Sequence, residues 1–252
     1  MKLLVLSDLH LVSPSDPYVR DHEKRNHFTQ GRLHLPAIKK AILGESPDLI
    51  LSLGDLVDWY SEENRDYALE FLHSLNIPWK FTPGNHDSAA PPHQNKGIGL
   101  DGWTTAGVDV HNRKLSLDHL EAYLLNSHNS NVSSDSSFWF EQNLDSGAFN
   151  AVFTHVPPDV PEVREAIAQR DPQRNLTQYV QSGAPKLYED SLQGKIDLTF
   201  SGHLHFHTQA ESGRTRFHIL PLATKAYQKS YPEQGHLFFF DTASKNLEKL
   251  PF

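Results

Sequence analysis

Five short segments of the chain place carboxylate, imidazole and amide side chains directly after apolar runs. In chain order they are Asp8-Leu9-His10, Gly54-Asp55-Leu56-Val57-Asp58, Gly84-Asn85-His86-Asp87, His155 and Gly202-His203-Leu204-His205. Oxygen and nitrogen donors of these kinds suit Mn, Fe, Zn, Co or Mg, and a carboxylate can bridge two ions about 3.5–4 Å apart. These residue types therefore predict a metal centre, and they allow two ions that share one ligand.

The spacing within the segments favours convergence. Glycine precedes the first candidate ligand of the second, third and fifth segments, where it permits a tight turn and a close approach of the backbone. Asp8 and His10 form an i, i+2 pair, as do His203 and His205, and in extended backbone such pairs point to the same side. We expect each pair to serve one cluster of ligands.

Each segment by itself is weak support for a metal centre. An aspartate after a strand, such as Asp8, more often caps a turn, and Gly-Asp is an ordinary turn pair. His155 alone would be a core or surface histidine. The tetrapeptide at residues 84–87 is more specific. Five such segments, each after an apolar run and in one order, favour a shared site over five unrelated turns.

The apolar runs before the segments predict strands at residues 3–6, 49–53, 79–82, 151–154 and 198–201. Residues 33–43 and 62–75 carry apolar side chains at helical spacing, so the order β-α-β-α-β predicts right-handed crossovers and a mainly parallel sheet. Residues 217–220 and 237–241 are further predicted strands, expected to form a second sheet face with antiparallel neighbours. Ligand sites in such folds lie at the carboxyl ends of strands, so the five segments should meet there.

The composition narrows the chemistry. The 252 residues include sixteen histidines and no cysteine, which excludes disulfides, thiolate zinc sites, Cys-ligated iron–sulfur clusters and a cysteine nucleophile. The 23 lysines and arginines against 31 aspartates and glutamates give a net charge of −8, so we expect no long nucleic acid as a partner. The first apolar run ends too early for a secretory or membrane-spanning segment, which predicts a cytoplasmic protein with no membrane partner.

In their order and composition, the five segments resemble the signature of the calcineurin-like metallophosphoesterase superfamily: D-x-H, G-D-x-x-D, G-N-H-D/E, H and G-H-x-H. The match runs from Asp8 to His205 without a substitution. The resemblance implies a four-layer α/β sandwich, two mixed sheets flanked by helices, as a single metallophosphoesterase domain over residues 1–252. It also implies one ion held by Asp8, His10, Asp55 and His205, and a second held by Asp55, Asn85, His155 and His203, with Asp55 as the bridge.

The resemblance further implies that His86 faces the substrate, as a general acid for the leaving group or as a stabiliser of the transition state. Asp58 would orient His86, and Asp87 would support the ligands from behind. Two ions, of Mn, Fe, Zn or Co, would lower the pKa of a bridging water so that hydroxide attacks phosphorus in line, without a side-chain nucleophile. We expect a phosphoesterase that acts on small phosphodiesters, cyclic nucleotides included, or on phosphomonoesters.

The residues next to the segments distinguish between subgroups of the superfamily. Protein serine/threonine phosphatases of the superfamily continue the second and third segments with arginines, whereas this chain has Trp59 and Ser88-Ala89 there. Lipid A pathway pyrophosphohydrolases usually carry arginine in place of His86. The segments look most like those of bacterial class III cyclic-nucleotide phosphodiesterases. A nuclease or nucleotide pyrophosphatase on the same fold is an alternative, as is a non-catalytic metal-binding scaffold, and the oligomeric state stays open.

Residues in the loops offer weaker candidates for substrate specificity. Arginines between the fourth and fifth segments could meet a second phosphate, although a solvated helix face is the favoured interpretation; they are Arg164, Arg170 and Arg174. Three aromatic residues could stack on a base, although core packing is favoured for them; they are Trp59, Tyr60 and Trp103. Four further histidines lie close to the segments, three as candidates for the rim of the site and the last as a spectator: His22, His27, His93 and His207.

Overall fold

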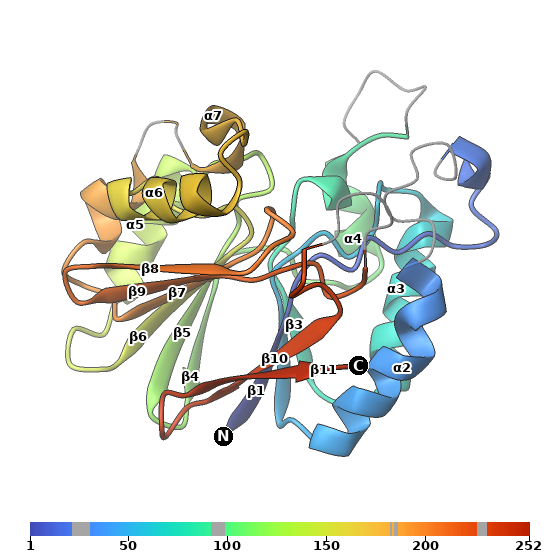
Figure 1. Cartoon of the computed structure of the whole chain (residues 1–252), viewed down its shortest axis with the longest axis horizontal. Coiled ribbons are helices and arrows are strands. Elements are labelled where there is room, and N and C mark those ends of the chain that lie inside the picture. The colour runs from blue at the N-terminus through green and yellow to red at the C-terminus, as the bar shows by residue number, and fades with distance from the viewer. Residues whose placement is uncertain (22–30, 92–98, 182, 184–185, 226–230) are drawn as a thin grey trace.

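The computed structural model describes residues 1–21, 31–91, 99–181, 183, 186–225 and 231–252. Figure 1 shows two β-sheets with helices on the outer side of each. One sheet has the strand order β11-β10-β1-β2-β3 and the other β4-β5-β6-β7-β9-β8. Both contain parallel and antiparallel neighbours. The predicted fold class, two mixed sheets flanked by helices, is confirmed.

The first sheet is built from the two ends of the chain. Its strands are β1 (Lys2–Leu6), β2 (Leu49–Ser52), β3 (Trp79–Phe81), β10 (His236–Asp241) and β11 (Leu247–Pro251). The first three are parallel, and the helices α2 (Gly31–Glu45) and α3 (Glu62–Ser74) connect them in turn. The side chain of Ser61 caps α3 by accepting a hydrogen bond from the Asn64 amide. The predicted β-α-β-α-β order is therefore confirmed.

The second sheet comes from the middle of the chain. Its strands are β4 (Arg113–Leu117), β5 (Leu120–Leu125), β6 (Asn150–Thr154), β7 (Leu198–Ser201), β8 (Thr208–Ser212) and β9 (Thr215–Ile219). The helical segments that follow β5 and β6 are α5 (Ser134–Asn143), α6 (Pro161–Arg170), α7 (Leu176–Tyr179) and the π-helix η2 (Tyr188–Leu192). Two short helical pieces, η1 (His86–Ser88) and α4 (Asp101–Thr105), follow β3.

The expectation for the C-terminal strands was wrong in one respect. They do not form one sheet face together, because β9 pairs in parallel with β7 of the second sheet, whereas β10 pairs antiparallel with β1 of the first. The sequence of β10 explains its place. Phe238 and Phe240 pack between the sheets, and Leu237 and Phe239 pack on the opposite face with α2 and α3. A strand that buries apolar side chains on both faces belongs inside a sheet.

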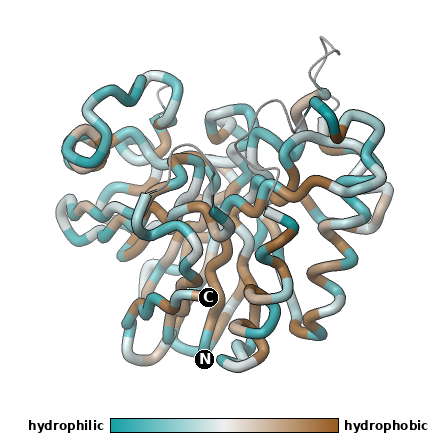
Figure 2. Tube along the Cα trace, turned by 45° about the vertical axis from the view of Figure 1, so that its right-hand side comes forward, coloured by the Kyte–Doolittle hydropathy of each residue, from teal (hydrophilic) through white to brown (hydrophobic). Residues whose placement is uncertain are grey.

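Three apolar clusters hold the layers together. One lies between the first sheet and the helices α2 and α3, and a second between the second sheet and the segments α5, α6 and η2. The third joins the two sheets, with Leu3 and Leu51 on one side and Phe153 and Phe200 on the other. In Figure 2, hydrophobic residues follow the inner strands and hydrophilic residues follow the outer loops. No helix in the described part of the chain is long and apolar enough to cross a membrane.

Candidate metal centre

The ligand-bearing residues lie in loops at the carboxyl ends of strands from both sheets. Asp8 and His10 follow β1, Asp55 follows β2, and His155 and His203 follow β6 and β7. Since β1 and β2 are parallel neighbours, as are β6 and β7, their loops emerge side by side. The centre therefore forms where the two sheets meet at one end.

The expected extended backbone at the i, i+2 pairs was wrong. The φ angles at these ligand positions are positive: 51° at Asp8, 46° at His10, 50° at Asp55, 71° at His203 and 61° at His205. Residues other than glycine occupy this left-handed region rarely and at a cost of order 1–3 kcal/mol. Each pair still serves one centre, but sharp turns direct the side chains there.

The expected close approach of backbone at the glycines is confirmed. Gly54 has φ 96°, and a Cβ atom there would collide with the backbone of Gly84. A Cβ atom on Gly84 would overlap the Asp55 carboxylate, and one on Gly202 would overlap the carboxylate of Asp8. These three positions bring the loops within contact of one another.

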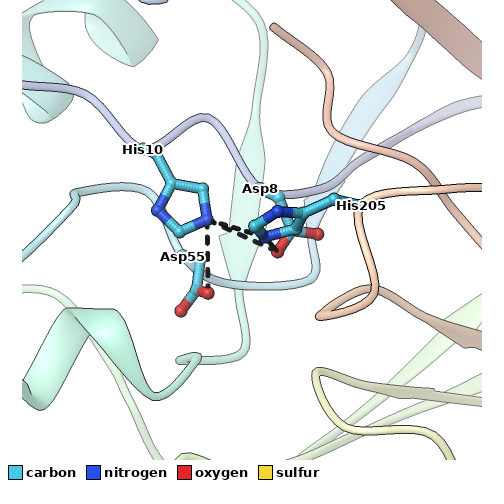
Figure 3. A group of neighbouring side chains, drawn as sticks. All are labelled: Asp8, His10, Asp55 and His205. Carbon is cyan, nitrogen blue, oxygen red and sulfur yellow. Dashed lines mark hydrogen bonds and ion pairs between the residues drawn. The ribbon is translucent and has the colours of Figure 1, made fainter. Parts of the chain in front are cut away.

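The first ligand group consists of Asp8, His10, Asp55 and His205, drawn in Figure 3. The Nε2 atoms of His10 and His205 are 3.1 Å apart. Asp8 Oδ1 lies 3.4 Å from His205 Nε2, and Asp55 Oδ2 lies 3.5 Å from His10 Nε2. Asp8 and His10 are fully buried. Two carboxylates and two imidazoles thus face one another across the space of a single cation.

The second ligand group consists of Asp55, Asn85, His155 and His203. Nε2 of His155 lies 3.3 Å from Asp55 Oδ2, 3.1 Å from the side-chain oxygen of Asn85 and 3.2 Å from His203 Nδ1. Asp55 Oδ2 therefore lies near an imidazole of each group. The structure brings together every residue that the sequence predicts as a metal ligand.

Two observations indicate that these donors fit cations. Asp55 Oδ2 is buried and no described residue donates a hydrogen bond to it, although it lies between the two groups. His155 Nδ1 donates to the Leu53 carbonyl at 2.8 Å, so Nε2, next to Asn85, is the ring nitrogen that can bind a cation once it has lost its proton. Two imidazole nitrogens and an amide oxygen that converge at these distances suit a cation as their common partner.

His86 lies beside the first group and is held by Asp58. Its Nδ1 donates to the Asp58 backbone carbonyl at 2.6 Å and lies 3.4 Å from the Asp58 carboxylate. The same carboxylate lies 3.5 Å from His10 Nδ1. About 20% of the His86 side chain is exposed. Asp58 is thus placed to orient both imidazoles, while the far edge of the His86 ring stays accessible.

The Asp87 side chain links the second and third segments by hydrogen bonds to their backbone amides. Its buried carboxylate accepts hydrogen bonds from the amides of Gly84 at 2.8 Å, Asp55 at 2.8 Å, Leu56 at 2.9 Å and Val57 at 3.3 Å. Burial and the nearby charge of Asp55 raise the pKa of Asp87 to about 7, against the opposing effect of these amides. This carboxylate fixes the loop that presents Asp55.

The density of charge shifts several pKa values. Burial raises the pKa of Asp8, but the neighbouring imidazoles of His10 and His205 outweigh it and hold that pKa well below its ordinary value. Burial lowers the pKa of His155, but Asp55 outweighs it and raises that pKa to about 9. Burial and the charge of His155 lower the pKa of His203 to about 3. Without a cation, the aspartates therefore retain a proton on His155.

The weaker loop candidates do not face the centre. Trp59, Tyr60 and Trp103 are buried, and none is available to stack on a base; core packing, the favoured interpretation, is confirmed. Trp103 Nε1 donates to the Asp87 carbonyl at 2.8 Å, which supports the third segment. The ring of His207 lies against Phe238, with ring centroids 5.0 Å apart.

The three arginines that could have met a second phosphate pair with acidic residues instead. Arg164 binds Asp159, Arg170 binds Glu233 at 2.6 Å, and Arg174 binds Asp171 at 3.1 Å. The candidate rim histidines His22, His27 and His93 lie outside the described residues.

Two contacts of the second ligand group could not be predicted from the sequence. The buried hydroxyl of Ser127 accepts the amide hydrogens of His155 at 3.1 Å and Val156 at 3.0 Å. Tyr179 at the end of α7 packs on the His203 ring, with centroids 5.0 Å apart. Neither residue belongs to a motif. The sequence carries no signal that sets Tyr179 apart from Tyr188, which also lies between the fourth and fifth segments.

Comparisons with known proteins agree with this architecture. A model of the calcineurin-like phosphoesterase family matches residues 1–207. No curated protein sequence is significantly similar to the chain. Among solved structures, a dimetal phosphatase from Danio rerio is similar with a TM-score of 0.59 and 12% identity, over 100% of this chain and 99% of that one.

Two other solved structures have the same fold. The phosphopantetheinyl hydrolase of Mycobacterium tuberculosis has a TM-score of 0.53 and 13% identity, over 87% of this chain and 89% of that one. GAP50, the anchor in the inner membrane complex of Plasmodium, has a TM-score of 0.53 and 12% identity, over 100% and 89%. The fold thus occurs in hydrolases and in an anchor, so the chemistry must be argued from the side chains.

Proposed function

Because the chain belongs to the calcineurin-like phosphoesterase family and is thus a metallophosphoesterase, we propose that it hydrolyses small phosphodiesters with two divalent ions. The observation that carries this proposal is the buried Asp55 Oδ2, which lies 3.5 Å from His10 Nε2 and 3.3 Å from His155 Nε2. A carboxylate oxygen that accepts no hydrogen bond from the described residues, between two sets of nitrogen donors, suits a bridging ligand.

We assign one ion to the first ligand group and the other to the second, with Asp55 common to both. The donors are imidazole nitrogen, carboxylate and amide oxygen, a set that accepts Mn, Fe, Zn or Co. When bound, two divalent ions lower the pKa of water and neutralise charge on phosphate oxygens. Asp8 remains ionised at neutral pH because His10 and His205 lower its pKa. Asp87 holds the Asp55 loop in the required conformation.

His86 supplies the proton for the leaving group in this proposal. Nδ1 donates to the Asp58 carbonyl, so the other ring nitrogen, Nε2, is the one that can donate to an ester oxygen. Burial lowers the pKa of His86, but Asp55 and Asp58 outweigh it and raise that pKa to about 10. The imidazole is therefore protonated at neutral pH. Nearby cations lower the pKa of such a group toward the range that suits a general acid.

A small phosphodiester, cyclic nucleotides included, is the substrate class we favour over a phosphomonoester. The arginines that grip phosphate in the protein phosphatases of the superfamily are missing after Asp58 and Asp87, and Arg164, Arg170 and Arg174 pair with acidic residues. The net charge of −8 disfavours long nucleic acids, which a nuclease would require. A scaffold role would not require His86 and Asp58. We further propose that the chain is a single domain and that the protein is cytoplasmic.

Metal analysis with a turnover assay tests the proposal. The wild type should take up two Mn ions per chain and hydrolyse bis(p-nitrophenyl) phosphate. Asp55→Asn should weaken the binding of both ions, since it removes the carboxylate that they would share. His86→Ala should keep both ions and slow hydrolysis about 10²–10⁴-fold, the usual contribution of a general acid. His111→Ala, at an exposed histidine outside both groups, is the control.

Each outcome has a distinct meaning. If no metal binds and Mn does not support hydrolysis, the proposed activity is wrong. If His86→Ala releases the ions, the role assigned to His86 is wrong. A panel of 3′,5′- and 2′,3′-cyclic nucleotides, phosphomonoesters and dinucleotide pyrophosphates then compares the substrate classes, and the strongest turnover should fall on a diester.

A further inference from the structure

The end of α7 contacts His203 of the second ligand group. His203 Nε2 lies 3.4 Å from the Gln178 carbonyl oxygen, and the Tyr179 ring lies 5.0 Å from the His203 ring, tilted by 39°. Both contacts come from consecutive residues of a helix that spans Leu176–Tyr179. No motif of the sequence includes this helix, so the two contacts are a feature of the folded chain.

The carbonyl contact determines the tautomer of His203. A carbonyl oxygen only accepts hydrogen bonds, so Nε2 must carry the ring proton, and in the neutral imidazole Nδ1 then has a free lone pair. That Nδ1 lies 3.2 Å from His155 Nε2, inside the second ligand group. The Gln178 carbonyl therefore directs the lone pair of His203 toward the second ion.

Tyr179 is itself held in place from behind. The Arg174 guanidinium lies 4.5 Å from the centroid of the Tyr179 ring, so the tyrosine is in contact with both Arg174 and His203. Arg174 binds Asp171 at 3.1 Å and donates to the Tyr231 hydroxyl at 3.3 Å. The Tyr231 hydroxyl in turn donates to Asp171 at 2.9 Å. These contacts anchor a short helix that could not hold its own orientation.

We propose that Tyr179, together with the Gln178 carbonyl, is a positioning element for the second metal ion. The carbonyl fixes the tautomer of His203, and the aromatic ring fixes the plane of the imidazole. Residues that orient a ligating histidine in this way typically change metal affinity about 10–100-fold when they are replaced. The inference rests on the proposed dinuclear centre, and it confines the effect of α7 to one of the two ions.

Metal titration of the full-length protein tests this role without relying on activity. Metal-free wild type, Tyr179→Ala, Tyr179→Phe and Tyr67→Ala are titrated with Mn²⁺, and the two binding steps are resolved by calorimetry. His203→Ala and His205→Ala serve as references that identify which step belongs to which ion. Tyr67 is a half-buried tyrosine of α3 that packs on the first apolar cluster, so its variant controls for loss of a tyrosine ring.

Tyr179→Ala should weaken the affinity for the second ion about 10–100-fold and leave the affinity for the first ion unchanged. Tyr179→Phe should bind as the wild type does, because the ring and not the hydroxyl touches His203. Equal affinities in Tyr179→Ala and wild type would overturn the proposal, as would equal weakening of both steps with a lowered melting temperature. Wild-type protein that takes up fewer than two ions would instead refute the dinuclear centre on which the inference rests.

Discussion

The two halves of the centre are held by different kinds of contact. In the first half, main-chain hydrogen bonds join the loops after β1 and β2: the amides of Asp8, His10 and Leu11 donate to the carbonyls of Gly54, Asp55 and Leu56. In the second half, a single main-chain hydrogen bond joins the loops after β6 and β7, from the Gly202 amide to the His155 carbonyl at 2.9 Å. Further support comes from the Ser127 side chain and from Gln178 and Tyr179 of a short helix. The supporting contacts of the first half thus lie in or next to the sequence motifs, whereas Ser127, Gln178 and Tyr179 lie outside them.

The strongest test of this difference is Asp87→Ala. The substitution leaves three amides of the Asp55 loop and the amide of Gly84 without their acceptor. We therefore expect a loss of about 3–5 kcal/mol in the free energy of unfolding, and weak binding of both ions. Asp87→Asn, which keeps one acceptor oxygen, should lose less. Chemical denaturation and Mn²⁺ uptake measure both effects. An unchanged free energy of unfolding would mean that the Asp55 loop keeps its conformation without Asp87.

Acidification should weaken the binding of the second ion. The pKa of His155 is about 9, so without metal this ring is protonated at neutral pH and must lose its proton to bind. Affinity for the second ion should therefore rise about tenfold per pH unit between pH 6 and 8, one proton being released. Mn²⁺ titrations at pH 6, 7 and 8 provide the measurement. A second step that is independent of pH would contradict the assignment of His155.

The smallest effect is expected for Ser127→Ala. The variant leaves the buried amides of His155 and Val156 without an acceptor, which should cost about 1–3 kcal/mol of stability. The variant should also lower the affinity for the second ion and leave the affinity for the first ion unchanged. The matched control is Ser137→Ala, because the buried Ser137 hydroxyl has no hydrogen-bond partner among the described residues. If both variants behave alike in Mn²⁺ titration and thermal unfolding, Ser127 does not support His155.

The parts of the fold that the sequence predicted share a physical basis. Buried parallel strands such as β2 and β6 are continuous apolar runs, and they were identified from that pattern. β5 was missed because Leu, Glu and Ala favour helices, and only its neighbours in the sheet make it a strand. β4 was missed because it is an edge strand whose residues are mostly half-exposed, so no apolar pattern marks it.

The site shows the same division. Asp8, His10 and Asp55 could be found because short motifs carry them, and their convergence follows from the parallel strands. Their left-handed backbone could not be anticipated, because it results from hydrogen bonds between loops far apart in sequence. Tyr179 and Ser127 act only through tertiary contacts. No local pattern distinguishes such residues from any other polar or aromatic residue of a loop.

The ligands come from both sheets, and this has a consequence for folding. Asp8 and Asp55 extend from the first sheet and His155 and His203 from the second, and an apolar cluster joins the layers beneath them. Any ion bound across this boundary acts as a removable cross-link between the layers. At a free ion concentration of about 100 times its dissociation constant, each ion would add about 3 kcal/mol to the stability of the fold. The supply of metal would then govern how long the folded chain persists, as well as whether it is active.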